Sequence, residues 1–211
     1  MTRHISSLAI ICLAIFVLAA CSSNHMKKVV IMANGKMTMD ESKQKIKLDP
    51  GNTHTEQEIE FNSGDKITLN IESPDGVKTF DLAEDGIYLL NLKVDTLVGG
   101  IVNYSAAERT TAISGEQLER MIDSTRQLIE GKNTSDEKKT YFIIPWNIKK
   151  ISTNASVKII GPYKGIPYKV EVDDSGKATE IYKFFTNKQK RETLNDLLKR
   201  FGPGTPPDAG Q

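Results

Sequence analysis

Short segments of alternating apolar and polar residues, separated by turn residues, fill the first half of the chain. In the segment 67–71, Ile, Leu and Ile alternate with Thr and Asn, and a Pro-Asp-Gly turn follows at 74–76. Alternation with a period of two places the apolar side chains on one face of a β-strand. Because such segments recur between 29 and 104 about every 8–12 residues, we expect an antiparallel sandwich or barrel there.

Two details of this region predict where the chain turns. Asn34-Gly35 follows the apolar segment 29–32 and precedes alternating methionines, which is a strong signal for a hairpin turn. The segment 51–55, which contains His54, is rich in turn residues and is expected to be a loop.

The pattern changes to a helical period after residue 113. Ser114 and Gln117 have the spacing of a capping box, in which each side chain bonds the backbone of the other residue. Apolar residues from Leu118 to Ile129 then fall on one helical face, and Gly131 supplies a stop signal. The sequence therefore predicts an amphipathic helix here, followed by a polar linker at 132–139.

A second, smaller part follows the linker. Strands are expected at 141–144, 157–160, 168–172 and 178–185, a final helix at 187–201, and a proline-rich disordered tail at 202–211. The predicted fold is thus α+β and β-rich: a sandwich-like N-terminal part, one amphipathic helix, and a strand-strand-helix part. We place the domain ending in the amphipathic helix at 28–131 and the basic part at 138–201.

The N-terminal segment has the features of an export signal. Arg3 and His4 precede an apolar run at 8–20, which at 13 residues is too short to cross a bilayer as a helix. The run ends in Leu-Ala-Ala at 18–20, with Cys21 next.

This ending resembles the lipobox of bacterial lipoproteins. The resemblance implies that residues 1–20 are a signal peptide, that Cys21 receives the lipid, and that 21–27 is a short tether. Lipoproteins that stay at the inner membrane often have aspartate directly after the lipidated cysteine. Position 22 is instead serine, so the resemblance favours the outer membrane, with the domain facing the periplasm. Each buried methylene of an acyl chain contributes about 0.8 kcal/mol, so several chains on Cys21 would hold the protein firmly.

The overall net charge of +1 excludes a general affinity for nucleic acid, but the charges are unevenly distributed. Residues 22–137 contain 13 Lys and Arg against 20 Asp and Glu, a balance of −7, whereas 138–200 contain 14 against 6, a balance of +8. Either the two parts attract each other, or the basic part faces an anionic envelope polymer or lipid headgroups.

The residues that usually carry cofactors and catalysis are scarce. Cys12 would be removed with the signal peptide, so Cys21 is the last cysteine, and only His25 and His54 remain of the histidines. These counts leave no thiolate nucleophile and no histidine-rich metal site, and the chain lacks a phosphate-binding glycine loop. We therefore expect no metal, no cofactor and no catalytic role for His54.

Three acidic pairs could in principle act as calcium ligands or as catalytic carboxylates. They are Asp40-Glu41, Glu84-Asp85 and Asp173-Asp174. None has the spacing of a calcium loop, and each lies beside a turn signal, where acids are usually solvated. We expect them to be turn residues.

The aromatic residues are concentrated where the basic residues are. Of the 14 aromatic residues, 9 follow Thr140. Aromatic rings among lysines can stack on sugars or bind a polymer, although such rings more often belong to a core. The candidate face for a ligand or partner comprises Trp146, Tyr163, Tyr168, Lys149, Lys150 and Lys164.

Three functions remain possible from the sequence. The first is a lipid-anchored, non-enzymatic module of the cell envelope that binds a protein or an anionic or sugar polymer. The second is a carrier of an apolar ligand or lipid in a β-rich cavity, and the third is a carboxylate-dependent hydrolase.

Overall fold

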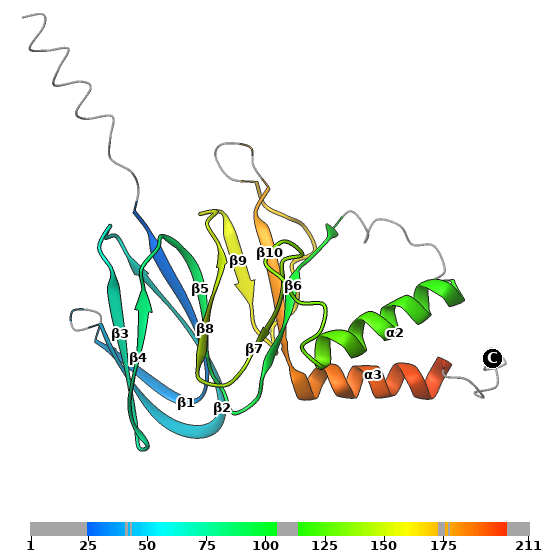
Figure 1. Cartoon of the computed structure of the whole chain (residues 1–211), viewed down its shortest axis with the longest axis horizontal. Coiled ribbons are helices and arrows are strands. Elements are labelled where there is room, and N and C mark those ends of the chain that lie inside the picture. The colour runs from blue at the N-terminus through cyan, green and yellow to red at the C-terminus, as the bar shows by residue number, and fades with distance from the viewer. Residues whose placement is uncertain are drawn as a thin grey trace, which may run out of the picture.

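The computed structural model describes residues 25–40, 42, 44–104, 114–172, 176 and 178–201, and it consists of two β-sheets and two helices (Figure 1). The predicted lipid acceptor Cys21, the signal peptide and the tail at 202–211 lie outside these residues. The β-rich α+β class predicted from the sequence is confirmed.

The larger sheet has six strands. Their spatial order is β4 (Gly76–Leu82), β3 (Ile67–Ser73), β2 (Lys45–Phe61), β1 (Lys27–Asp40), β5 (Gly86–Leu92) and β8 (Asn147–Ser152). The smaller sheet has four strands, in the order β7 (Thr140–Ile143), β6 (Leu97–Ile101), β10 (Glu180–Thr186) and β9 (Val157–Ile160). Both sheets are mixed rather than purely antiparallel, because the pairs β1 with β5, β2 with β3, and β10 with β9 are parallel.

The hairpin turn predicted at Asn34-Gly35 is wrong, because β1 continues through these residues as a bent strand. The register with β2 shifts there: Gly35 pairs with Pro50, and Asn34 pairs with His54. Gly35 has a φ of 118°, and a Cβ at this position would lie 2.1 Å from the carbonyl oxygen of Asp49. The glycine therefore bends a paired strand instead of reversing it, as the curved ribbons of β1 and β2 show in Figure 1, and the chain reverses only after Asp40.

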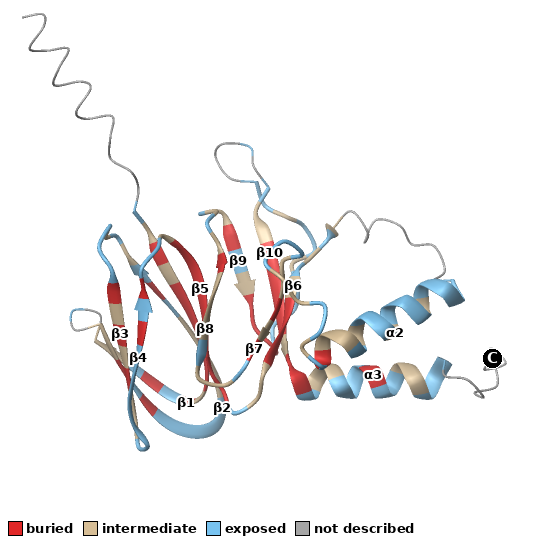
Figure 2. Cartoon of the chain, in the orientation of Figure 1, coloured by how far each residue is buried: buried red, intermediate tan, exposed pale blue. Residues whose placement is uncertain are grey.

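The bend gives the larger sheet an apolar interior of its own. Side chains from β1 to β5 form one buried cluster there, which includes Ile31, Leu69 and Leu90. A second cluster lies between the two sheets and includes Met32, Leu89 and Phe184. Because both faces of β5 are covered, all seven of its residues are buried (Figure 2).

Two helices extend beside the smaller sheet as an arm, α2 (Gly115–Ile129) and α3 (Asn187–Phe201). The predicted capping box is present, since Ser114 and Gln117 each bond the backbone of the other. Figure 1 shows α2 running toward the sheets and α3 running away from them. Both helices predicted from the sequence are confirmed, and we call the pair the α2–α3 arm.

Other predicted segments differ from the structure. The strand expected at 168–172 is irregular and makes only an isolated bridge between Val172 and Ala178. Strand β8 was not predicted, and it joins the larger sheet, while β6 from the N-terminal part joins the smaller one. The two parts distinguished in the sequence therefore share both sheets.

Candidate functional site

The residues predicted to form one ligand face lie in separate places. Lys149 and Lys150 on β8 line a hollow at the boundary between the two sheets. Trp146 instead packs, half-buried, against the interior of the larger sheet. Its carbonyl oxygen accepts a hydrogen bond of 2.7 Å from Lys78 on β4, so it connects two edge strands.

The remaining three predicted residues follow β9. Tyr163 and Lys164 contact a polar cluster between the sheets. Tyr168 makes no part of that cluster and is 94% exposed. The sequence therefore identified residues of two candidate sites, but it did not distinguish between the sites.

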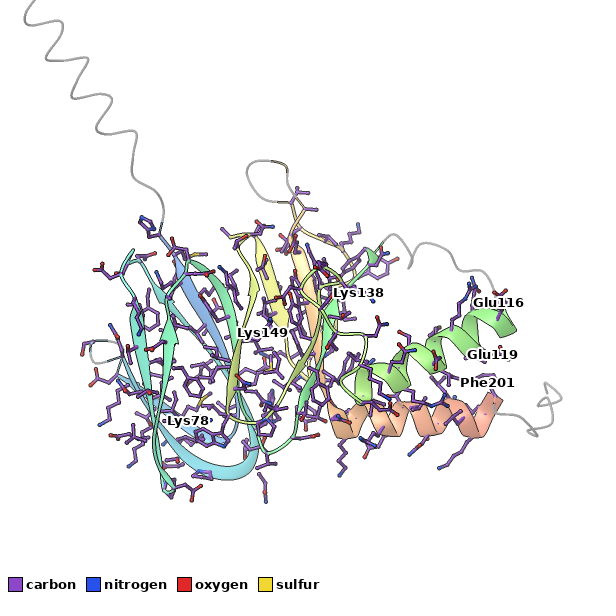
Figure 3. The ribbon with its side chains drawn as sticks, in the orientation of Figure 1. Lys78, Glu116, Glu119, Lys138, Lys149 and Phe201 are labelled. Atoms are coloured by element: carbon purple, nitrogen blue, oxygen red, sulfur yellow. The ribbon has the colours of Figure 1, made fainter. Side chains whose placement is uncertain are left out.

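The first site is a groove beside β7 and β8. A hollow of about 480 Å³ adjoins one of about 240 Å³, and both are lined by Asp136, Tyr141 and Lys149. The two hollows therefore form one continuous depression, which we call the β7–β8 groove. Figure 3 labels Lys149 on β8 and Lys138 in the turn before β7.

Each of the three lysines that line the groove pairs with a carboxylate. Lys149 pairs with Asp136 at 2.9 Å, and Lys139 pairs with Glu180 at 2.8 Å. Lys150 bonds Glu84 at 2.6 Å, and this hydrogen bond holds the pKa of Glu84 below its usual value. Since Asp136 and Glu84 are largely exposed, their pairs contribute little to stability and can exchange with an incoming ligand.

The floor of the groove consists of buried neutral donors. The Tyr141 hydroxyl donates to the carbonyl oxygen of Ile151 at 2.9 Å, and the Tyr182 hydroxyl donates to Glu180 at 3.0 Å. Burial, together with the charges of Asp136 and Glu180, raises the pKa of Tyr141 to about 12. Burial and the hydrogen bond to Glu180 also raise the pKa of Tyr182, so both phenols stay protonated at neutral pH.

One side-chain amide in the groove has no partner among the described residues. The Nδ2 atom of Asn154 is buried and makes no hydrogen bond to any of them, although Asn154 lines the larger hollow. Its Oδ1 atom is fixed by the amide of Ser156 at 3.1 Å. A buried polar atom without a partner costs about 1–3 kcal/mol, so a ligand or a water molecule that accepts from Nδ2 would be stabilised.

The second site is the inter-sheet cluster of Asn34, His54, Glu56, Lys93, Tyr163 and Lys164. The Nζ atom of Lys93 lies 2.5 Å from Asn34 Oδ1 and 3.1 Å from His54 Nδ1. The Nε2 atom of His54 lies 2.7 Å from one oxygen of Glu56, and Lys164 Nζ lies 2.5 Å from the other oxygen. The ring of Tyr163 covers His54 edge-on at a centroid distance of 4.9 Å.

The inter-sheet cluster holds its charges by mutual pairing. Burial opposes ionisation of Glu56, but hydrogen bonds from Lys164 and His54 outweigh it and hold the pKa of Glu56 below its usual value. Burial lowers the pKa of Lys93, and the charge of Glu56 partly opposes that effect. Because an ammonium group can only donate, Nδ1 of His54 accepts from Lys93 and Nε2 carries the proton donated to Glu56.

Both ring nitrogens of His54 are therefore hydrogen-bonded to side chains of the inter-sheet cluster. Its prediction as a loop residue is wrong, because His54 lies on β2 directly after the bulge. The signal that could have located it is the pair His54 and Glu56, which have strand spacing and share one face. The turn-forming residues of the bulge interrupt the alternating pattern just before His54, so the strand spacing could not be recognised from the sequence.

Lys183 holds the segment after β9, which covers the inter-sheet cluster. Its ammonium group donates to the carbonyl oxygens of Gly161 at 2.5 Å and Lys164 at 2.6 Å. A Cβ at Gly161 would lie 1.7 Å from an oxygen of Glu56, so only glycine fits without displacing that carboxylate. The inter-sheet cluster therefore joins β2 of one sheet to the segment after β9 of the other.

The acidic pairs do not converge on a metal or catalytic centre where they are described. Glu84 bonds Lys150, and Asp85 bonds Lys27 at 2.8 Å. Asp173-Asp174 and Glu41 lie outside the described residues. Among the residues that the structure describes, no group of three His, Cys, Asp or Glu side chains is placed to hold a metal ion.

Comparison with protein-family models, curated proteins and solved structures gives no significant match for this chain. Within the described ranges, no helix has the length and apolar character needed to cross a membrane.

Proposed function

We propose that this protein is a lipid-anchored, non-enzymatic module of the bacterial cell envelope that binds a sugar polymer in the β7–β8 groove. The lipobox at 18–21 supports the anchoring. The groove supports the binding, and its continuity over two adjoining hollows is the observation that carries the proposal. An extended depression suits a chain of repeating units better than one compact ligand.

The groove presents the groups that polyhydroxylated ligands need. The smaller hollow combines the Phe142 ring with the hydroxyl groups of Thr134, Ser135 and Thr140. A ring face can stack on the apolar side of a sugar, while hydroxyl groups bond its oxygens. The larger hollow adds three lysines and the unpartnered amide of Asn154, which would bond hydroxyl or acidic groups of the polymer.

The test is a binding measurement with polysaccharides isolated from the envelope. Replacing Lys149 and Asn154 with alanine should weaken binding about tenfold, equivalent to about 1.4 kcal/mol. Lys158→Ala is the matched control, because Lys158 is an exposed lysine on β9 outside the two hollows. Equal binding by the double variant and the control would contradict the proposed groove.

Lys164 is a poor choice for this test, although the sequence placed it on the same face as Lys149. Lys164 bonds Glu56 in the inter-sheet cluster, so its replacement would disturb the contact between the sheets. A loss of binding in Lys164→Glu would therefore not distinguish a ligand contact from a loss of stability.

One observation favours the hydrolase as a second candidate. Asp136 and Glu180 both line the larger hollow, as a pair of catalytic carboxylates would. Each of them, however, is engaged by a lysine. The same polysaccharides should be recovered at full length after incubation with the protein, and the release of short sugars would favour the hydrolase instead.

The carrier function is less well supported, because side chains fill the interior that a carrier would keep open. Leu69, Ile71 and Leu82 are fully buried in the cluster inside the larger sheet. The anchoring itself is tested by Cys21→Ser, which should abolish acyl labelling and release the protein from the detergent phase. A variant that is still labelled would contradict the anchoring.

A further inference from the structure

One end of the sandwich combines the tether with exposed apolar side chains. Strand β1 begins at Lys27, directly after the tether, and β5 runs parallel to it from Gly86. Strand β8 ends at this end, because Ser152 pairs with Ile87, and Figure 1 shows β9 and β10 beginning there as well. We call this the tether end.

The segment that follows β9 returns to the tether end and exposes apolar side chains. Tyr168 is 94% exposed, the highest value among the large hydrophobic residues described, and Val172 is 67% exposed. Ile101, at the end of β6, is 40% exposed. Because β6 is antiparallel to β10, Ile101 lies near the start of β10 and hence at the tether end.

The backbone beside Tyr168 is held in place although its side chain is exposed. The Tyr104 hydroxyl donates to the carbonyl oxygen of Pro167 at 2.8 Å. Further back, Lys183 fixes the carbonyl oxygens of Gly161 and Lys164, and the amide of Thr179 bonds the Glu171 carbonyl oxygen at 2.9 Å. An anchored backbone loses little conformational freedom when its exposed side chain binds.

The length of the tether limits what can cover these side chains. Cys21 and Lys27 are separated by six residue steps, which span at most about 20 Å when extended. A domain with its lipid on Cys21 therefore keeps the tether end close to the bilayer. Tyrosine is enriched at membrane interfaces, where its ring is buried and its hydroxyl group stays hydrated.

The net charge of this segment bears on whether it would insert through apolar side chains or adsorb electrostatically. Residues 163–179 contain Lys164, Lys169 and Lys177 against Glu171, Asp173 and Asp174, so their net charge is zero. A segment without net charge gains little from anionic headgroups, so its proposed contact rests mainly on its apolar side chains.

From these observations we propose that Tyr168 and Val172, which lie at the same end of the sandwich as Ile101, insert into the bilayer interface and orient the domain on the membrane. This proposal rests on the anchoring proposed above. It adds a second membrane contact, made by the folded domain itself, and it places the tether end against the lipid.

Labelling with a fluorophore tests the proposal on the full mature chain. Cys21 would be acylated and Cys12 removed, so a cysteine introduced by substitution is the single reactive thiol. Val172→Cys would be compared with Val94→Cys, because Val94 is 82% exposed and follows β5 at the end opposite the tether. The labelled proteins would be reconstituted into vesicles of phosphatidylethanolamine and phosphatidylglycerol containing a nitroxide-labelled lipid.

Quenching at position 172 should be at least about twofold stronger than at 94, since interfacial insertion reaches roughly 5–10 Å into the headgroup region. The same difference is expected in phosphatidylcholine vesicles, because the contact is apolar. Equal, weak quenching at both positions in vesicle-bound protein would overturn the insertion and leave the anchoring intact. Quenching at 172 that disappears without phosphatidylglycerol would also overturn the insertion, because the contact would then be electrostatic. Protein that does not associate with the vesicles would overturn both the insertion and the anchoring.

Discussion

The β-sandwich and the α2–α3 arm reach their structures by different physical means. In β5 every residue is buried, and its neighbours come from distant parts of the chain. In the arm only Ile129, Asn187 and Leu194 are buried, and most other side chains are partly or fully exposed. The sandwich depends on long-range packing of buried strands, whereas the arm combines local signals such as its capping box with the contact of α2 and α3.

The largest expected effect on stability comes from replacing a glycine in the sandwich, and we compare it with the same replacement in the arm. In Gly99→Ala, the new Cβ on β6 would lie 2.1 Å from the carbonyl oxygen of Lys183 and 2.8 Å from the Cα of Phe184. Both atoms belong to the backbone of β10, so the two strands must separate, and we expect the free energy of unfolding to fall by at least about 3 kcal/mol. Chemical denaturation of the purified protein would measure the change.

The matched variant in the arm is Gly115→Ala. Among the described residues, no atom outside the neighbouring helix backbone lies within 4 Å of a Cβ at the first residue of α2, and alanine favours a helix over glycine by about 1 kcal/mol. We expect an unchanged or slightly higher stability. Equal losses in the two variants would show that the arm is as tightly packed as the sandwich, contrary to the comparison above.

The next effect is a loss of stability of the sandwich at alkaline pH. The pKa of Tyr141 is raised from 10.0 to about 12 in the folded protein, so the folded state keeps a proton that the unfolded chain loses. The resulting stabilisation is complete below pH 10 and declines as the pH rises toward 12, by about 2 kcal/mol in all. Denaturation at pH 9, 10, 11 and 12 should show this decline.

Tyr141→Phe is the variant that checks the cause. It should be less stable at neutral pH by about 1 kcal/mol, because the bond to the carbonyl of Ile151 is lost, but its stability should decline less between pH 10 and 12. Neither α2 nor α3 contains a tyrosine, so the arm should not add to the decline. An unchanged slope in Tyr141→Phe would assign the alkaline sensitivity to other groups.

The smallest of the three effects concerns the start of α2. Ser114→Ala removes the hydroxyl that accepts from the Gln117 amide, and we expect it to cost the helix about 1 kcal/mol. Hydrogen exchange should accelerate in the first turn of α2, while the melting temperature of the sandwich stays nearly constant. Ser124→Ala, an exposed serine within the same helix, is the control and should leave exchange in the first turn unchanged.

The same contrast explains which elements could be predicted from the sequence. The capping box and the apolar face of α2 are local sequence signals, as is the apolar pattern of α3. Both helices could therefore be predicted. The bend at Gly35 could not be predicted, because the same Asn-Gly signal is compatible with a turn or a bulge. Which of the two forms depends on whether the flanking residues pair with β2.

The site was predicted only in part, for a related reason. Lys149 and Lys150 were identified from local charge, but their hollow is completed by Tyr141 on the other sheet and by Asp136 in the turn before β7. The Asn154 amide could not be recognised as a ligand donor from the sequence, because that role depends on its burial in the folded protein. His54 and Lys93 are 39 positions apart in sequence, and their side chains meet across Asn34 of β1, the strand that lies between β2 and β5.

The place at which the tether joins the fold has a mechanical consequence. The tether continues directly into β1, which is hydrogen-bonded to β2 on one side and to β5 on the other. A pull on the tether along β1 would act parallel to this strand and across the hydrogen bonds of both ladders, so many bonds share the load at once. A strand at the edge of the sheet, peeled away sideways, would instead lose its bonds one after another. With the lipid on Cys21, as proposed above, this attachment through β1 would allow the fold to resist tension on the tether.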